Sequence, residues 1–389
     1  MHNRLIYLDH AATTPLDPRV LEAMLPFLSG MSGNASSIHQ VGRAALQALD
    51  DAREQVALVL GCQPKEIVFT SGGSESINLA LKGVAMALRA QGKNHLISST
   101  IEHHAVLHAL DYLVEYEGFT VTLLPVDRNG RVNPADLSAA IRPETALVSV
   151  MYANNETGVI QPITELAAIC RERGVLFHTD AVQAPGQLSL DVNALGVDLL
   201  SLTAHKFYGP QGVGLLYLRR GTPLVPQING GAQERRRRAG TENVAGIVGL
   251  AKALTIAESE RTTHASRLRA LSERLIDGVL SRVPQSWLNG DRGSRLPSIV
   301  NLGFACIETE SLLLLLDQRG ICASSGSACT SGSLEPSHVL LAMGLSPEEA
   351  NGSIRFSLGR QTTDEQIDIV LDLLPDLVAQ LRTVTSCAK

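Results

Sequence analysis

The chain of 389 residues is poor in aromatic side chains, which make up 4% of it, and it has a single tryptophan. It also lacks an apolar run long enough to span a membrane, because stretches such as Leu312–Leu316 are far too short. Met1–Leu8 has neither the apolar run of a signal peptide nor the arginine-rich pattern of a transit peptide. These absences predict a cytoplasmic protein that does not associate with a membrane.

The chain also lacks the patterns of a metal site and of a nucleic-acid binder. None of its six cysteines forms a CxxC pair, and no His–Cys spacing fits zinc. The net charge is −6, whereas a nucleic-acid binder normally carries a basic surplus. We therefore expect no resident metal, no nucleic-acid partner and, in a cytosolic chain, no disulfide. The cysteines are Cys62, Cys170, Cys306, Cys322, Cys329 and Cys387.

Short apolar strands alternate with amphipathic helices over most of the chain. Gly42–Leu60 is typical of a helix that Gly61 ends, and Ile67–Thr70 and His95–Ser99 are typical of buried strands. Strands that are apolar throughout and separated by helices indicate a mostly parallel sheet covered on both faces. The predicted fold class is therefore α/β, with a large domain of this kind.

The pattern changes after about residue 260. A charged helix over Ser259–Ser281 precedes strands at Ser298–Phe304 and Ser353–Leu358, and a last helix begins at a capping box formed by Thr362 and Glu365. This indicates a smaller α+β domain. We predict a large domain over residues 16–259 and a small domain built from residues 1–15 and 260–389.

Polar residues stand where predicted strands end, which is where an open α/β sheet binds its ligands. Asp180 follows the strand Val175–Thr179 and could hold a ring nitrogen in its protonated form; a helix N-cap is the ordinary alternative for an aspartate there. Lys206 follows the strand Asp198–Leu202 as the only charged residue of an apolar stretch. Burial would favour its neutral, nucleophilic amine, and the alternative is a lysine that reaches solvent.

Ser71–Glu75 supplies a third part, a glycine-rich turn that opens a helix after the strand Ile67–Thr70. Backbone N–H groups and the positive end of the helix dipole can hold a phosphate there, although such turns often bind nothing. A lysine, an acid for a ring nitrogen and a phosphate cradle are the parts that pyridoxal 5'-phosphate requires. Their joint occurrence predicts this cofactor.

The same residues lie in motifs that resemble the group V aminotransferase family, and within it the cysteine desulfurases of the NifS/IscS type. The resemblance extends from Tyr7-Leu-Asp-His-Ala-Ala-Thr-Thr-Pro to Ser353-Ile-Arg-Phe-Ser-Leu-Gly-Arg. Between these ends, the motifs are Thr70-Ser-Gly-Gly-Ser-Glu-Ser, Glu102-His103, Asn154-Asn-Glu-Thr-Gly, His178-Thr-Asp-Ala-Val-Gln and Ala204-His-Lys-Phe-Tyr-Gly-Pro.

The resemblance implies a role for each site residue. Lys206 would bind the cofactor covalently, Asp180 would face its ring nitrogen, Gln183 its hydroxyl, and His103 would stack on the ring and move protons. Asn155 would contribute to both the cofactor site and the substrate site, where Arg355 would bind the substrate carboxylate beside Asn34. Gly73, Ser74, Thr203 and His205 would hold the phosphate, and Thr241 would reach the phosphate of a neighbouring subunit in a homodimer.

Two other clusters have alternative interpretations. His103, His104 and His108 could form a metal site, but no cysteine partner is near them in the sequence. The run Arg235–Arg238 could contact nucleic acid, but in an acidic chain a solvated loop or a subunit interface is favoured.

Cys329 lies in Ala323–Ser333, a segment made almost entirely of small residues, which can bury little apolar area. A cysteine there is not an ordinary core thiol, and an arm of this length could carry its sulfur roughly 20 Å. The family resemblance implies that Cys329 carries a persulfide and makes a transient iron–sulfur contact, whereas Cys322 is interpreted as structural.

The resemblance therefore implies a cytoplasmic, homodimeric transferase that removes sulfur from L-cysteine, gives L-alanine and a persulfide, and passes the sulfur to an acceptor or iron–sulfur scaffold protein. Iron–sulfur cluster assembly and nitrogen fixation both use this chemistry. The alternatives are a selenocysteine lyase, another group V enzyme that would not need Cys329, and, in a different class, a non-catalytic sulfur-pathway scaffold.

Overall fold

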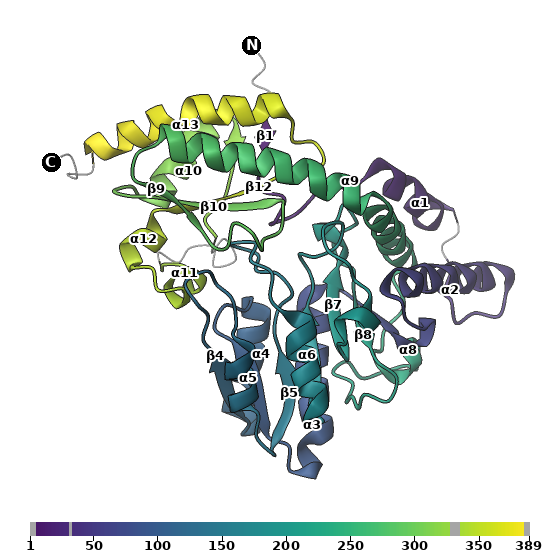
Figure 1. The fold of residues 1–389 in the computed structure, drawn as a ribbon. Helices are drawn as coiled ribbons and strands as arrows, with labels where there is room; N and C mark the ends of the chain where they lie inside the picture. Colours follow the sequence, from purple (N-terminus) through teal and green to yellow (C-terminus); the bar gives the residue numbers. More distant parts are fainter. Residues whose placement is uncertain (1–4, 31–32, 327–334, 385–389) are drawn as a thin grey trace.

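The computed structural model describes residues 5–30, 33–326 and 335–384, and its centre is a seven-stranded sheet (Figure 1). In sheet order the strands are β2 (Ile67–Thr70), β8 (Gly214–Leu218), β7 (Leu199–Thr203), β6 (Leu176–Asp180), β5 (Thr145–Ser149), β3 (His95–Ser99) and β4 (Thr120–Leu124). All of them run in one direction except β8, which pairs antiparallel with both β2 and β7. The expected mostly parallel sheet is confirmed.

Helices cover both faces of this sheet. Because side chains alternate along a strand, Phe69 of β2 belongs to the core on the face covered by α2 and α6, while its neighbour Val68 belongs to the core on the other face, covered by α3 and α4. The helices up to residue 240 are α1 (Pro18–Ser29), α2 (Gln40–Leu60), α3 (Gly73–Leu88), α4 (His104–Glu117), α5 (Pro134–Ala140), α6 (Ile163–Glu172), α7 (Val192–Leu195) and α8 (Gln233–Arg236). Short 3₁₀ turns span Pro64–Glu66, Arg89–Gln91 and Ala204–Lys206.

The C-terminal part forms a second, smaller layer with its own core. An antiparallel sheet has the order β12 (Ser353–Ser357), β10 (Ile299–Phe304) and β9 (Ser286–Asn289). The N-terminal strand β1 (Ile6–Tyr7) pairs with β11 (Ile321–Cys322), so the start of the chain packs with its end. The helices here are α10 (Thr309–Gln318), α11 (His338–Ala342), α12 (Pro347–Asn351) and α13 (Asp364–Val384).

One helix, α9 (Val244–Arg282), joins the two layers and corrects the sequence prediction. The charged helix was expected to begin at Ser259, but it begins at Val244 and runs for 39 residues. Its first half packs into the core of the large sheet through Leu250 and Leu254, and its second half packs into the smaller core through Leu271 and Leu275. The helix passes from one core to the other near residues 259 and 260, where the domain boundary was predicted. The division into domains remains a prediction.

One further local prediction was wrong, because the last helix is capped by Thr363 and Gln366 rather than by Thr362 and Glu365. No prediction had been made for the helices α1 and α4. The Thr363 hydroxyl accepts a hydrogen bond from the Gln366 N–H, and the Gln366 side chain accepts one from the Thr363 N–H. Within the described part of the chain, no helix is long and apolar enough to cross a membrane.

We expect Gly214 to tolerate no side chain. It is the first residue of β8 and packs against the backbone of β7 and of the glycine-rich turn. A Cβ atom there would lie 2.7 Å from the backbone oxygen of Leu202 and 2.8 Å from the Cα atom of Gly72. We predict that Gly214→Ala lowers the free energy of unfolding by about 1–3 kcal/mol, measured by urea denaturation. Gly30→Ala is the control, because its Cβ would be 3.7 Å from the nearest atom; equal effects would contradict the prediction.

Candidate functional site

A cavity of about 320 Å³ opens at the edge of the large sheet where the parallel strands end. It is the size of an ordinary small-molecule site. Most of the residues singled out from the sequence line it together. The lining consists of Ala11, Ala12, Gly73, Ser74, Ile77, His103, Ala105, Met151, Ala153, Asn155, Asp180, Val182, Gln183, Thr203, His205, Lys206 and Arg355.

Lys206 extends into this cavity from the 3₁₀ turn that follows β7. Its Nζ atom donates hydrogen bonds to the backbone oxygens of Ala11 (2.6 Å) and Ala12 (2.7 Å). Lys206 is half-buried, and its amine is directed to these two carbonyls. The amine is held by neutral carbonyls from the far end of the chain.

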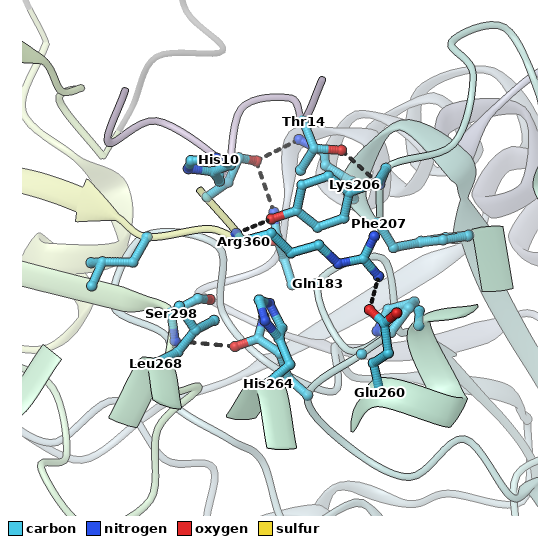
Figure 2. Close-up of a pocket in the computed structure, with 17 residues that line it drawn as sticks. His10, Thr14, Gln183, Lys206, Phe207, Glu260, His264, Leu268, Ser298 and Arg360 are labelled. Atoms are coloured by element: carbon cyan, nitrogen blue, oxygen red, sulfur yellow. Dashed lines mark hydrogen bonds and ion pairs between the residues drawn. The ribbon is translucent and has the colours of Figure 1, made fainter. Parts of the chain in front are cut away.

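The N-terminal segment that supplies these carbonyls is itself fixed to the turn. The Thr14 hydroxyl donates to the backbone oxygen of His205 (2.9 Å) and accepts from the N–H of Tyr208 (2.7 Å). Figure 2 shows this region around a second, smaller pocket of about 30 Å³, which shares Ala11, Gln183 and Lys206 with the large cavity. The fixed segment keeps the two carbonyls at the lysine.

Asp180 is the last residue of β6 and is 5% exposed. Burial raises the pKa of its carboxyl group to about 6, although a hydrogen bond from the Val182 N–H and the charge of Lys206 oppose this. The N-cap alternative was half right: the carboxylate does accept an N–H two residues on, at 2.9 Å, but the chain continues as a turn and not as a helix. The carboxylate is therefore available to a ligand in the cavity.

His103 caps the N-terminus of α4, and its Nδ1 accepts a hydrogen bond from the N–H of Ala105 (3.0 Å). Burial is the main reason why its pKa falls to about 4, and the nearby charge of Lys206 adds to the effect. The ring is therefore neutral at pH 7 and can accept a proton. This fits the expected role of a group that moves protons at the cavity wall.

The glycine-rich turn that the sequence predicts as a phosphate cradle lies at the start of α3. Gly73 lies so near to β6 and β7 that a Cβ atom on it would be 3.2 Å from Val182 Cγ2 and 3.6 Å from Thr203 Cβ. Ser74 and His205 complete this side of the cavity. Since the first N–H groups of a helix have no partner within it, α3 presents donors and a positive dipole end to an anion here.

Arg355 lies on the opposite wall and is 3% exposed. Its guanidinium group donates to the backbone oxygen of Asn155 (2.9 Å) and forms an ion pair with Asp9 (2.9 Å). The side chain is thus held from two sides while it lines the cavity. A buried guanidinium in this position suits a carboxylate ligand.

Two predicted site residues are not brought to this cavity, and a third cannot be placed. Asn34 and Thr241 are exposed and do not line it. Cys329 lies outside the described residues. Cys322 ends β11, and burial raises the pKa of its thiol, which agrees with the interpretation of Cys322 as structural.

The loop that leads to Thr241 is anchored by buried charges. Glu234, Arg235 and Arg236 have positive φ angles of 44°, 58° and 64°, a conformation that costs about 1–3 kcal/mol per non-glycine residue. The carboxylate of Glu234 accepts hydrogen bonds from both terminal nitrogens of Arg53 and from the N–H of Phe69. These contacts hold the loop in its strained form.

The two alternative clusters gain no support as ligand sites. His104 stacks on His108 at 5.0 Å between ring centroids and lies 4.8 Å from His338, but no group of three or more metal-binding side chains suited to a metal ion occurs in the described part of the chain. In the arginine run, Arg238 forms an ion pair with Glu75 at the phosphate cradle. The run is therefore not a uniform basic face.

Sequence reasoning missed the carbonyls of Ala11 and Ala12, and it also missed Met151 and Val182. Every residue has a backbone oxygen, so no sequence pattern could have singled out these two alanines. Met151 and Val182 each lie just beyond a strand end, β5 and β6, so the rule that found Asp180 could have found them.

Comparisons with known proteins agree with this geometry. The model of the family described as "Aminotransferase class-V" matches residues 6–370. The chain belongs to this family. It is 53% identical to "Cysteine desulfurase IscS" of Dictyoglomus turgidum and 52% identical to that of Methanosarcina thermophila, over 98% of this chain and 96% and 94% of the two relatives.

The solved structures give the same result. A structure titled "NIFS-LIKE PROTEIN" is 39% identical, covers 97% of this chain and all of its own, and superposes with a TM-score of 0.91. Another, "SspA in complex with cysteine", is also 39% identical, covers 91% of this chain and 98% of its own, and has a TM-score of 0.80. The expected family and fold are confirmed, and so is pyridoxal 5'-phosphate as the cofactor of the family.

The residues of the cavity fit this cofactor. A lysine amine, a buried carboxylate, a neutral imidazole and a helix N-terminus line one space of sufficient volume. These are the groups that the cofactor's aldehyde, ring nitrogen, ring face and phosphate require.

The anchor of the strained loop should be essential to stability. Removing one partner of a buried ion pair costs roughly 3–5 kcal/mol because the other charge stays buried and unpaired, so Glu234→Ala should lower the free energy of unfolding by that amount in urea denaturation. The control is Asp372→Ala, which breaks an exposed pair with Arg282 and should cost less than about 1 kcal/mol. Similar losses in both variants would disprove the anchoring role.

Proposed function

We propose that the protein is a cysteine desulfurase, a pyridoxal 5'-phosphate-dependent transferase that removes sulfur from L-cysteine. The products are L-alanine and a persulfide on Cys329. The observation that carries this proposal is one cavity lined by Lys206, Asp180 and His103, in a chain about half identical to proteins named cysteine desulfurase.

The cofactor, when bound, supplies an electron sink that stabilises negative charge at the substrate carbon. In the proposal, the Lys206 amine binds it and Asp180 keeps its ring nitrogen protonated. Gln183 faces the ring hydroxyl, and its amide also donates to the backbone oxygen of Ala11 (3.1 Å). Gly73, Ser74, Thr203 and His205 would hold the phosphate of the cofactor.

The substrate is oriented by other residues of the lining. Arg355 would bind the carboxylate of cysteine with Asn155, and Asn34, which does not line the cavity here, would contribute from its loop. Lys206 and His103 would move the Cα proton, for which His103 is suited because its ring is neutral at pH 7. The sulfur of the substrate would remain for a second nucleophile.

Cys329 is that nucleophile. Its thiolate attacks the substrate sulfur, so an S–S bond forms while the bond from sulfur to Cβ breaks, and Cβ gains a proton to give alanine. The persulfide is then passed to a sulfur acceptor or iron–sulfur scaffold protein, for iron–sulfur cluster assembly in general or for nitrogen fixation. A transient iron–sulfur contact at Cys329 belongs to this step.

We also propose a cytoplasmic homodimer. Leu21, Leu25 and Leu28 form one exposed apolar stripe on α1, with exposed fractions of 42%, 48% and 57%. Such a stripe is typical of a surface that another chain covers. Thr241 is exposed on its own loop, which agrees with a role at the neighbouring subunit's phosphate.

Cys329→Ala should separate cofactor chemistry from sulfur transfer. The purified variant should keep the visible absorbance of the bound cofactor, because Cys329 takes no part in holding it, but it should form neither alanine nor sulfide from cysteine. Wild-type protein treated with cysteine should gain the mass of one sulfur atom at Cys329. Cys322→Ala is the control and should keep turnover; normal turnover of Cys329→Ala would refute the desulfurase proposal.

Asp180→Asn should weaken the reaction at the cofactor ring. An amide cannot hold the ring nitrogen protonated, so kcat should fall by about 100-fold or more, the loss that follows from removing one well-placed electrostatic group. The fold should be retained, since the amide oxygen can still accept the N–H of Val182. Steady-state alanine production and the absorbance of the bound cofactor test this, and an unchanged kcat would exclude the assigned role.

A further inference from the structure

Glu102 is a fully buried acid that none of the assigned roles uses. It stands between β3 and His103 and has an exposed fraction of 0%. Among the described residues it takes part in no ion pair, in contrast to Glu234, whose buried charge is matched by Arg53. An ionised carboxylate without a cation is costly in such surroundings.

The hydrogen bonds of Glu102 join two parts of the site. Its Oε1 atom accepts from the hydroxyl of Ser99 (2.5 Å) and from the N–H of Met151 (3.0 Å). Ser99 ends β3, and Met151 follows β5 and lines the cavity. Its Oε2 atom is buried and has no hydrogen-bond partner among the described residues. The Oε1 atom therefore links Ser99 to Met151. Its two hydrogen-bond donors are neutral, so they do not compensate a full negative charge on Glu102.

The titratable groups around Glu102 favour its neutral form. Asp180, at the end of β6, acts on it as a like charge. His103 follows it directly, and the Nε2–H of His338, on α11, donates to its backbone oxygen (2.9 Å). Burial lowers the pKa of both imidazoles, so neither supplies a positive charge at pH 7.

We propose that Glu102 is a positioning residue that works in its protonated, uncharged form. It ties the start of α4, which carries His103, to the end of β5, and it leaves Asp180 as the carboxylate that acts on the cofactor ring. A negative charge on Glu102 would be repelled by the carboxylate of Asp180. The assignment of roles to His103 and Asp180 rests on the proposed function, whereas the neutral state of Glu102 does not.

The titration behaviour supports the geometry. Burial, with the like charge of Asp180, raises the pKa of Glu102 to about 8, although the bonds from Ser99 and Met151 oppose this. The ordinary value is 4.5. The folded protein should therefore hold this proton through neutral pH while the unfolded chain has lost it.

Glu102→Gln is the matched variant, because an amide has nearly the shape of a protonated carboxyl group and cannot ionise. For an acid whose pKa is raised on folding, stability is fully present below the unfolded value and is lost as the pH rises to the folded value. The melting temperature of the wild type should therefore fall, relative to Glu102→Gln, between pH 5 and pH 8. A difference that stays constant over this range would overturn the protonated state.

Cofactor binding tests the positioning role with a readout other than turnover. At pH 7, Glu102→Gln should bind pyridoxal 5'-phosphate within about twofold of the wild-type affinity, followed by absorbance, since shape and charge are kept. Above pH 8 the wild-type affinity should fall and that of Glu102→Gln should not. A tenfold or larger loss in Glu102→Gln at pH 7 would mean that an ionised Glu102 is required, and would disprove the proposal.

Glu102→Ala supplies the second comparison, because it removes the bonds to Ser99 and Met151. It should bind the cofactor at least tenfold more weakly than Glu102→Gln at pH 7, and wild-type affinity in Glu102→Ala would disprove the positioning role. If neither the wild type nor the variants bound the cofactor, the proposed function would fail, while the melting comparison would still decide the charge of Glu102.

Discussion

The meeting of parallel strand ends at one edge of the sheet is the constraint on which the site depends. Because β2, β3, β5, β6 and β7 all point the same way, the residues that follow them face one space. The phosphate cradle, His103, Met151, Asp180 and Lys206 each come from a different strand end. The one reversed strand, β8, places no residue in the cavity and instead fills the sheet between β2 and β7.

A second constraint closes the space from residues distant in sequence. The N-terminal segment crosses to the large sheet, where the carbonyls of Ala11 and Ala12 hold the Lys206 amine. Asp9, a few residues earlier, holds Arg355 of β12. The cofactor side and the substrate side are thus fixed by one short stretch of chain, and a displacement of this stretch would disturb both. The position of the Lys206 amine therefore depends on the N-terminal segment, which is itself paired with the smaller layer.

These two constraints explain what the sequence could and could not predict. Asp180, Lys206 and Gly73 were found because a strand end is visible in local residue patterns. The carbonyl contacts of Lys206 were not found, because they depend on the path of the chain and not on residue type. The start of α9 was missed because its first turns, over residues 244–249, consist largely of glycine and β-branched residues, which have low helix propensity, and only packing into the large core makes them helical. The last helix was given the wrong cap because Thr362 and Thr363 offer the same hydroxyl, and the hydroxyl of Thr362 instead accepts a local hydrogen bond from the N–H of Gly359.

The last common feature of the site is that several of its buried titratable groups are uncharged. A charge in the protein interior is costly, so a buried titratable group is ionised only where neighbouring groups compensate its charge. His178, beneath the cavity, lies between the hydroxyls of Ser149 and Ser201, and burial lowers its pKa to about 3. With His103 also neutral, the surroundings of Asp180 contain few compensating charges other than the amine of Lys206. A cationic ring bound beside Asp180 would supply the missing partner, which gives the buried carboxylate a physical reason to select a protonated cofactor.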